Sequence, residues 1–173
     1  MSHGLTILAI DGPCCSGKTT YARQLAGQQD CNVFHMDDFF LRPEQRTVQR
    51  YATPGGNVDY ERFQEEVLVP LQEGRPFSYW PFCCATMTLG EPVYVQPKQL
   101  NIVEGTYSMH PVLRTFYTET VFLEIMPEEQ LRRLRERESP ESLQYFLSRW
   151  LPLEKLYFET FKPWTFCDRV FSF

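Results

Sequence analysis

Short apolar runs alternate with helical patterns along most of the chain. Leu5 to Ile10 is a continuous apolar run, which predicts a strand buried on both faces of a parallel sheet. Similar runs predict further strands at Cys31 to His35, Leu100 to Val103, Val121 to Ile125 and Arg169 to Phe173. Strands that alternate with helices in this way indicate a three-layer α/β/α domain around a mostly parallel sheet.

Apolar side chains at helical spacing predict the first helices between these strands. One helix follows Thr19 and ends near Gly27. Asp59 stands at the cap position of another, whose apolar face consists of Phe63, Val67, Leu68 and Leu71.

The C-terminal part predicts two more helices. Pro127 opens a highly charged helix that runs to about Glu138. A longer helix from about Glu141 to Phe161 is expected to kink at Pro152. We expect this helix to point five side chains inward: Leu143, Phe146, Leu147, Trp150 and Leu153.

Two segments read as irregular or locally folded. Residues 42–57 carry several prolines and glycines and predict a long loop, and long loops in compact domains tend to be functional. Residues 77–97 alternate weakly around Gly90 and predict a small β excursion. A length of 173 residues suits one domain, so residues 1–173 are expected to form a single unit.

Composition narrows the functional classes. The net charge of −5 argues against a nucleic-acid partner, because a phosphate backbone favours a basic surface. The six-residue apolar run near the start is too short for a signal peptide or a membrane span, so a cytoplasmic protein is expected. The six cysteines lack metal-site spacing and are expected to be reduced thiols. The oligomeric state stays open.

The segment from Gly12 to Thr19 fits the pattern G-x-x-x-x-G-K-S/T and lies between a predicted strand and a predicted helix. In such a P-loop the glycines let backbone N–H groups point at phosphate, the lysine reaches the β- and γ-phosphates, and the hydroxyl residue ligates Mg²⁺. This predicts a P-loop NTPase fold that binds a nucleoside triphosphate with Mg²⁺. ATP is the expected nucleotide, although the motif does not separate ATP from GTP. The expected phosphate contacts are Gly12, Cys14, Cys15, Ser16, Gly17, Lys18, Thr19 and Thr20.

Acidic residues after the strands are the candidates for chemistry. Phosphoryl transfer needs a carboxylate to take the proton of the acceptor hydroxyl. Asp37 follows the second predicted strand and is the candidate base, with a helix cap or loop acid as the structural alternative. Glu104 ends a strand where a magnesium-binding acid is expected, beside Thr19; Asp37 is the third candidate metal ligand. Asp59 is either a helix cap or a carboxylate that accepts bonds from a sugar diol.

The order of these residues is similar to that of the uridine kinase and nicotinamide riboside kinase family. The resemblance covers nearly the whole chain and rests mainly on Asp37-Asp38-Phe39-Phe40, placed between the P-loop and Asp59 and followed by Glu104. It extends to Arg132-Arg133-Leu134-Arg135-Glu136-Arg137 in the lid position, and it implies that residues 127–142 form a helical lid.

The resemblance implies a kinase that phosphorylates the 5′-hydroxyl of a ribonucleoside. It implies that Asp37 is the general base, that Lys18 serves catalysis, and that Asp59 holds the 2′- and 3′-hydroxyls. It also implies that Arg133 and Arg137 contact phosphate or ribose. From the residues alone, the acids and arginines of the lid also fit an ordinary solvated helix with i,i+4 pairs.

The acceptor side departs from the pyrimidine-specific members of the family. These members read the base with a tyrosine and, five residues later, a histidine. Tyr79 matches the first position, but Cys84 stands at the second. Tyr79 is expected to contact the acceptor, and the alternatives are a nicotinamide riboside kinase or a kinase of another vitamin or sugar alcohol.

A nucleotide-dependent switch that acts on a protein partner is the alternative from another class. Guanine-reading switches generally carry an N/T-K-x-D element, and none of the four lysines is followed by an aspartate two residues on. The kinase interpretation is therefore favoured, with a small-molecule acceptor as the partner.

Overall fold

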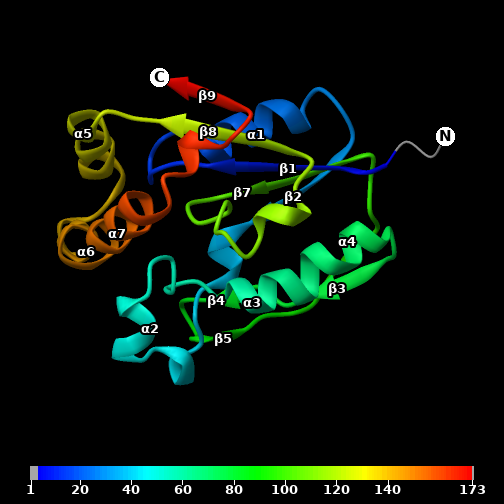
Figure 1. Ribbon diagram of the computed structural model, residues 1–173. Coiled ribbons are helices and arrows are strands. Elements are labelled where there is room, and N and C mark those ends of the chain that lie inside the picture. The colour runs from blue at the N-terminus through cyan, green and yellow to red at the C-terminus, as the bar shows by residue number, and fades with distance from the viewer. Residues whose placement is uncertain (1–3, 173) are drawn as a thin grey trace.

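The computed structural model describes residues 4–172, which fold around a five-stranded sheet (Figure 1). The sheet order is β2-β7-β1-β8-β9, and every neighbouring pair is parallel. Its strands are β1 (Thr6–Asp11), β2 (Cys31–His35), β7 (Leu100–Glu104), β8 (Glu119–Glu124) and β9 (Arg169–Ser172). All five predicted strands are present, although Phe173 lies outside the described residues.

Helices cover both faces of the sheet, which confirms the predicted three-layer α/β/α fold. On one face, Leu8 and Ile10 of β1 pack in a cluster with Ala22 of helix α1. On the other, Ile7 and Ala9 pack in a larger cluster with α3, α4 and α7. The helices are α1 (Lys18–Ala26), α2 (Val48–Ala52), α3 (Tyr60–Phe63), α4 (Val69–Glu73), α5 (Pro127–Arg137), α6 (Pro140–Tyr145) and α7 (Leu151–Phe161).

The parallel register places the ends of three strands level with one another. Glu104, the last residue of β7, lies opposite Ile10 of β1 on one side and His35 of β2 on the other. Because all three strands run the same way, their carboxyl ends meet at one edge. The segments that follow them therefore meet there too.

Two helical segments contain a π turn just before a proline. Residues Gln64–Leu68 form a π turn between α3 and α4, and Pro70 is the second residue of α4. Residues Phe146–Trp150 do the same between α6 and α7, where Pro152 is the second residue. Proline cannot donate the normal helical hydrogen bond, and a wider turn accommodates its ring. The kink expected at Pro152 thus takes the form of a π turn.

The predicted inward face of the last helix is wrong in part. Leu147 is 42% exposed, and the buried positions are Glu154, Tyr157 and Phe158 instead. Leu143, Phe146, Trp150 and Leu153 are only partly buried. A π turn lengthens the local period, so positions on either side of it no longer follow one helical stripe.

Residues 42–57, predicted as a loop, are more ordered than expected, whereas residues 77–97 form the predicted small β excursion. Residues 42–57 contain the short helix α2, capped by the Thr47 hydroxyl, which accepts a bond from the Arg50 N–H. Residues 77–97 form two small antiparallel pairs. These are β3 (Phe77–Tyr79) with β6 (Val93–Val95), and β4 (Phe82–Cys83) with β5 (Thr88–Leu89).

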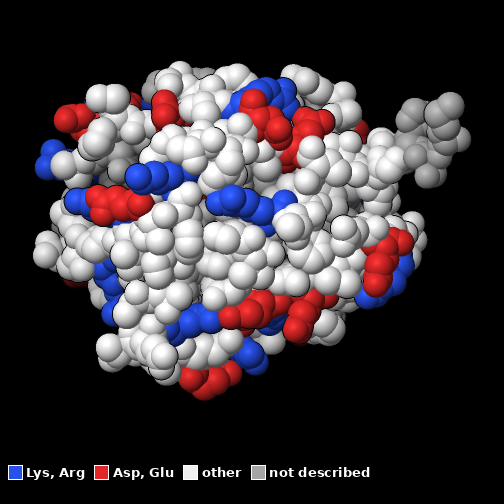
Figure 2. Space-filling model, in the orientation of Figure 1, with Lys and Arg blue, Asp and Glu red and all other residues white. Residues whose placement is uncertain are grey.

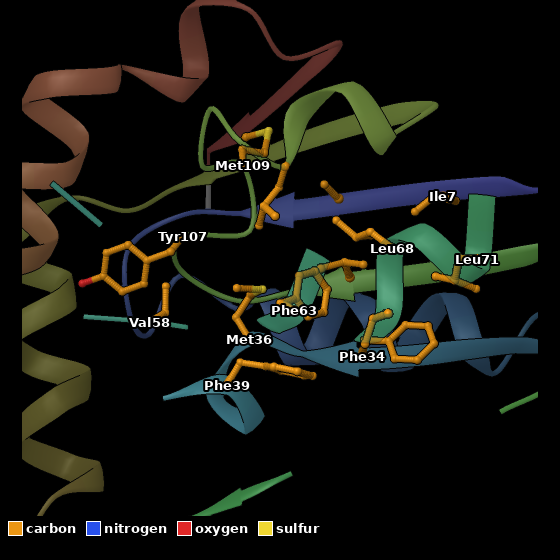
Figure 3. Close-up of a cluster of buried hydrophobic side chains, with 14 of the residues drawn as sticks. Ile7, Phe34, Met36, Phe39, Val58, Phe63, Leu68, Leu71, Tyr107 and Met109 are labelled. Atoms are coloured by element: carbon orange, nitrogen blue, oxygen red, sulfur yellow. The ribbon is translucent and has the colours of Figure 1, made fainter. Parts of the chain in front are cut away.

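Aromatic side chains make up much of the larger core cluster (Figure 3). Phe63 and Phe39 are fully buried and meet edge to face, with ring centroids 4.9 Å apart. Phe34 lies beside them against β3 (Figure 3). All six cysteines are free thiols.

The outer surface mixes charges of both signs on the face shown in Figure 2. Among residues 4–172, no helix is both long and apolar enough to span a membrane.

We expect Phe63→Ala to lower the free energy of unfolding by about 3–5 kcal/mol, because it empties a fully buried aromatic site. Denaturant titration measures this loss. Val48→Ala, at a position that is 90% exposed, is the control and should change the value by less than about 0.5 kcal/mol. A loss below about 1 kcal/mol at Phe63 would show that this cluster is not the core.

Candidate active site

A cavity of about 740 Å³ opens where the carboxyl ends of β1, β2 and β7 meet. Its walls come from the P-loop, the turn after β2, the segment after β7, the lid helix α5 and the last helices. On the P-loop side the lining residues are Cys14, Cys15, Gly17, Lys18, Thr19 and Thr20. Gly12 and Ser16 belong to the same loop but do not line the cavity.

The P-loop joins β1 to α1 and needs glycine at both ends. Gly12 has a φ of 150°, and a Cβ there would lie 2.3 Å from the carbonyl oxygen of Leu123. Gly17 caps α1 with a φ of 96°. Lys18 Nζ donates to the loop carbonyls of Gly12 and Pro13 at 2.9 and 2.7 Å. Lys18 has no carboxylate of residues 4–172 within salt-bridge distance, so this nearly buried cation is available to an anionic ligand.

Glu104, at the end of β7, contacts two polar side chains. Its Oε1 accepts a hydrogen bond from the Thr19 hydroxyl at 3.0 Å and lies 2.5 Å from His35 Nδ1. Burial raises the pKa of this carboxyl, but the His35 and Thr19 bonds outweigh it and leave the pKa below the usual glutamate value. The bond to Glu104 also raises the pKa of His35. The result is a buried carboxylate in its charged form.

Thr19 and Glu104 fit a magnesium site of the kind that nucleotide enzymes use. Mg²⁺ is usually held by one or two carboxylates or hydroxyls, with phosphate oxygens and water in its other positions. A hydroxyl and a charged carboxylate 3.0 Å apart beside a P-loop match that donor set. His35, which holds Glu104, was not among the predicted site residues. Its signal in the sequence was its place at the end of the second predicted strand. The register that sets it opposite Glu104 is seen only in the structure.

Asp37 lies in the turn after β2 and lines the cavity. Its carboxyl makes no hydrogen bond to any other residue of the described chain. Although the residue is exposed to the cavity, the surrounding protein atoms raise its pKa; Lys18 opposes this effect and the Glu104 charge adds to it. An unpaired carboxyl with a raised pKa is suited to accept a proton.

The lid helix α5 presents two arginines to the cavity. Arg133 Nη1 donates to the P-loop carbonyl of Cys15 at 3.0 Å, and its Nε pairs with Glu129. Arg137 lies 5.4 Å from the ring centroid of Phe146, and both arginines line the cavity. Arg132 follows the ordinary pattern of an exposed i,i+4 ion pair instead. The charged helix therefore has one solvated side and one side that faces the cavity.

Glu154 of α7 is a cavity residue that the sequence analysis missed. Its Oε2 accepts the backbone N–H of Cys14 in the P-loop at 2.9 Å, and its Oε1 accepts from Gln130 of α5 at 2.8 Å. The side chain is 7% exposed, and burial raises its pKa despite the Cys14 bond and the nearby Lys18. Glu154 of α7 thus links the P-loop to the lid helix α5. Helical spacing pointed only to its apolar neighbours.

Asp11 at the end of β1 was also missed. It is fully buried and accepts bonds from the backbone N–H groups of Gly12, Tyr107 and Met109 and from the Tyr157 hydroxyl. Burial raises its pKa to about 6. This carboxyl fixes the entry of the P-loop against the segment after β7. Its position directly before the first P-loop glycine was the available signal.

Two predicted acceptor contacts do not lie in the cavity. Asp59 is 2% exposed, caps α3 by accepting the Arg62 N–H at 3.2 Å, and accepts from Gln45 Nε2 at 2.9 Å. Its structural alternative, the helix cap, is what the structure shows. Tyr79 is 6% exposed and stacks on Phe39 in the core, so it does not reach the acceptor side of the cavity.

Other residues form the wall opposite the P-loop. Phe40 stacks on Trp150 with ring centroids 6.1 Å apart. The further lining residues on this side are Leu41, Arg46, Tyr51, Asn57, Cys84, Met87 and Phe146. Cys84 and Met87 come from the small β excursion and the rest from the loop after β2 or the last helices. The sequence could not predict that these positions share one wall, because they are far apart along the chain.

Comparison with known proteins supports the fold. No family model and no curated protein matches the sequence. The structure is similar to a possible uridine kinase from Bacillus stearothermophilus, with a TM-score of 0.74 and 25% identity over 97% of this chain and 89% of that one. It is also similar to phosphoribulokinase from Rhodobacter spheroides, with a TM-score of 0.66 and 12% identity over 99% of this chain and 71% of that one. A third similar structure is D-glycerate 3-kinase from Cryptococcus neoformans, with a TM-score of 0.58 and 14% identity over 88% of this chain and 79% of that one. The chain has the fold of the P-loop kinases.

We expect the stability difference between Glu154→Gln and the wild type to depend on pH. Because the pKa of Glu154 is raised in the folded protein, the fold favours the protonated, uncharged carboxyl. This stabilisation is complete below the ordinary glutamate pKa and is lost as pH rises through the folded-state pKa. Between about pH 4 and pH 8 the variant should therefore gain stability relative to the wild type, measured by denaturant titration at both pH values.

Glu159→Gln is the matched control, because Glu159 lies on the same helix with a 66% exposed side chain. Its difference from the wild type should not vary with pH. If the difference in free energy of unfolding between Glu154→Gln and the wild type stays constant with pH, or favours the wild type at pH 8, the pKa of Glu154 is not raised by the fold.

Proposed function

We propose that this protein is an ATP-dependent kinase that transfers the γ-phosphate to a hydroxyl of a small molecule. The best-supported acceptor is the 5′-hydroxyl of a ribonucleoside. One observation carries the proposal. The unpaired carboxyl of Asp37 lines the same cavity as Lys18 and the Thr19–Glu104 pair. A triphosphate site and a free base in one cavity are the two requirements of transfer to an alcohol.

In this mechanism the P-loop amides and Lys18 hold the β- and γ-phosphates. Thr19 and Glu104 would hold Mg²⁺, which would supply charge neutralisation on the phosphate oxygens. The acceptor hydroxyl lies between Asp37 and the γ-phosphorus. Its oxygen forms the new bond to phosphorus, the bond from phosphorus to the β–γ bridging oxygen breaks, and the hydroxyl proton passes to Asp37. ADP leaves with the bridging oxygen.

The lid arginines suit the charge that develops during transfer. Arg133 and Arg137 both line the cavity, and Arg133 already contacts the P-loop. Guanidinium groups bind phosphate oxygens in a forked geometry. In the structure these side chains pair with Glu129 and Glu138, so binding of a triphosphate would offer them a second anionic partner.

The wall around the acceptor favours a molecule with a ring. Phe40 and Trp150 stack on one another at this wall, and Tyr51 and Phe146 line it as well. The similarity to a possible uridine kinase supports a nucleoside. Cys84 faces this part of the cavity where pyrimidine-specific relatives carry histidine, which keeps nicotinamide riboside and other vitamin or sugar alcohols as alternatives.

A coupled ADP-release assay over a panel of acceptors tests the proposal. The panel contains uridine, cytidine, nicotinamide riboside, purine nucleosides and vitamin alcohols, each with ATP and Mg²⁺. At least one acceptor should raise ADP release well above hydrolysis by water. If no alcohol does so, the kinase proposal fails and a nucleotide-driven switch becomes the better interpretation.

We expect Asp37→Asn to reduce phosphoryl transfer by about 10²-fold or more while leaving ATP binding nearly intact, because the amide cannot take the proton. Initial rates and ATP titration measure the two effects separately. Asp38→Asn is the control: Asp38 does not line the cavity, and this variant should keep most of the rate. If Asp37→Asn weakens ATP binding as much as it slows turnover, the main role of Asp37 is that of a metal ligand.

We also expect Lys18→Ala to weaken both ATP affinity and the rate of transfer, by roughly tenfold or more each, because a charge-assisted contact to phosphate is lost. Calorimetric ATP titration and steady-state rates give the two values. An unchanged affinity would place the triphosphate elsewhere.

A further inference from the structure

Asn57 has a buried oxygen without a hydrogen-bond partner. The residue is 4% exposed, and its Oδ1 finds no donor among the described residues. A buried acceptor that stays unpaired is destabilising, because no hydrogen bond offsets the loss of its hydration. Asn57 also lines the cavity, so the missing donor can be supplied from there. The Asn57 amide N–H acts as a donor toward the Tyr107 hydroxyl and lowers the pKa of that tyrosine, so this contact leaves Oδ1 unpaired. Tyr107 lines the same cavity.

The backbone around Asn57 is held tightly, so the amide has a fixed place. Arg50 donates to the carbonyl of Gly56 at 2.7 Å and to that of Val58 at 2.9 Å. Val58 also bridges to Phe40, in the segment that carries Asp37. A Cβ at Gly56 would lie 2.2 Å from the Arg50 carbonyl oxygen, which shows how closely the chain passes itself here. Such support is typical of a residue that must be positioned for a ligand.

Asp59, two residues further on, is not free for this role. Gln45, the Arg62 N–H and the Arg62 guanidinium already surround its carboxylate, at 2.9, 3.2 and 3.5 Å. Asp59 does not line the cavity, whereas Asn57 does. The polar group that this segment offers to an acceptor is therefore the amide of Asn57.

We propose that Asn57 determines acceptor specificity by accepting a hydrogen bond from a second hydroxyl of the acceptor, which must then be a polyol. The proposal rests on the kinase function proposed above. An unpaired oxygen calls for a donor, and phosphate oxygens of ATP have no proton to give at neutral pH. A second hydroxyl of the acceptor meets this need. The ribose hydroxyls and the amino group of ATP are the other donors, but Asn57 is assigned to the acceptor side because its neighbour Val58 bridges to Phe40 in the segment that carries Asp37. Holding this second hydroxyl orients the first toward Asp37.

The first test compares acceptors on the wild-type protein. Uridine, cytidine and nicotinamide riboside are each assayed beside the analogues that lack the 2′- or the 3′-hydroxyl. For an acceptor that is turned over, removal of one of these hydroxyls should reduce kcat/KM by roughly tenfold, the loss expected when a buried acceptor returns to being unpaired. Equal rates for the acceptor and all its deoxy analogues would overturn the role of Asn57.

The second test uses Asn57→Ala and Asn57→Asp. The alanine variant should raise KM for the acceptor by roughly tenfold and leave KM for ATP within about twofold. It should also be insensitive to loss of the hydroxyl that matters to the wild type, because the two changes remove the same bond. Asn57→Asp keeps an oxygen acceptor and should recover most of the acceptor affinity, which a purely structural role through the amide N–H groups would not allow.

Asn32→Ala is the matched control, since Asn32 lies at the amino end of β2 and does not line the cavity. Its kinetic constants should match those of the wild type, and circular dichroism checks that each variant is folded. Turnover by Asn57→Ala with an unchanged acceptor KM would refute the inference while leaving the kinase function in place. Absence of turnover by the wild type with every panel acceptor would instead refute the kinase function, and the inference with it.

Discussion

The site depends on one constraint, the parallel register that places β7 between β1 and β2. Glu104 is level with Ile10 on one side and with His35 on the other. The carboxylate therefore meets Thr19, just beyond the P-loop turn, and His35 at once. A shift of β7 by one residue would turn Glu104 to the other face of the sheet and break both contacts. The chemistry of the cavity thus follows from strand pairing.

Buried carboxyls then connect the loops that leave this edge. Asp11 binds the start of the P-loop to the segment after β7 and to Tyr157 of α7, and Glu154 binds Cys14 of the same loop to α5. Each bond satisfies a polar group that burial would otherwise penalise. The P-loop is consequently held from three directions before any nucleotide arrives. Its shape belongs to the fold and does not wait for the ligand.

The sequence predicted what local patterns determine, namely the strands, most helices and the P-loop. It could not predict the partners of side chains that are distant along the chain. Asp59 was expected to contact an acceptor, yet Gln45 and Arg62 surround it. Tyr79 was assigned to the acceptor side and lies in the core, because aromatic residues favour both environments. Asn57 gave no signal, since an unpaired amide oxygen is visible only in three dimensions.

The central claim is that the cavity joins a phosphoryl donor to an alcohol. Phosphorus NMR of a reaction with ATP, Mg²⁺ and the acceptor panel tests it most directly, because it separates phosphate esters from inorganic phosphate. The account predicts an ester resonance that grows in step with ADP and is lost with Asp37→Asn. Growth of inorganic phosphate alone, with no ester from any acceptor, would contradict it.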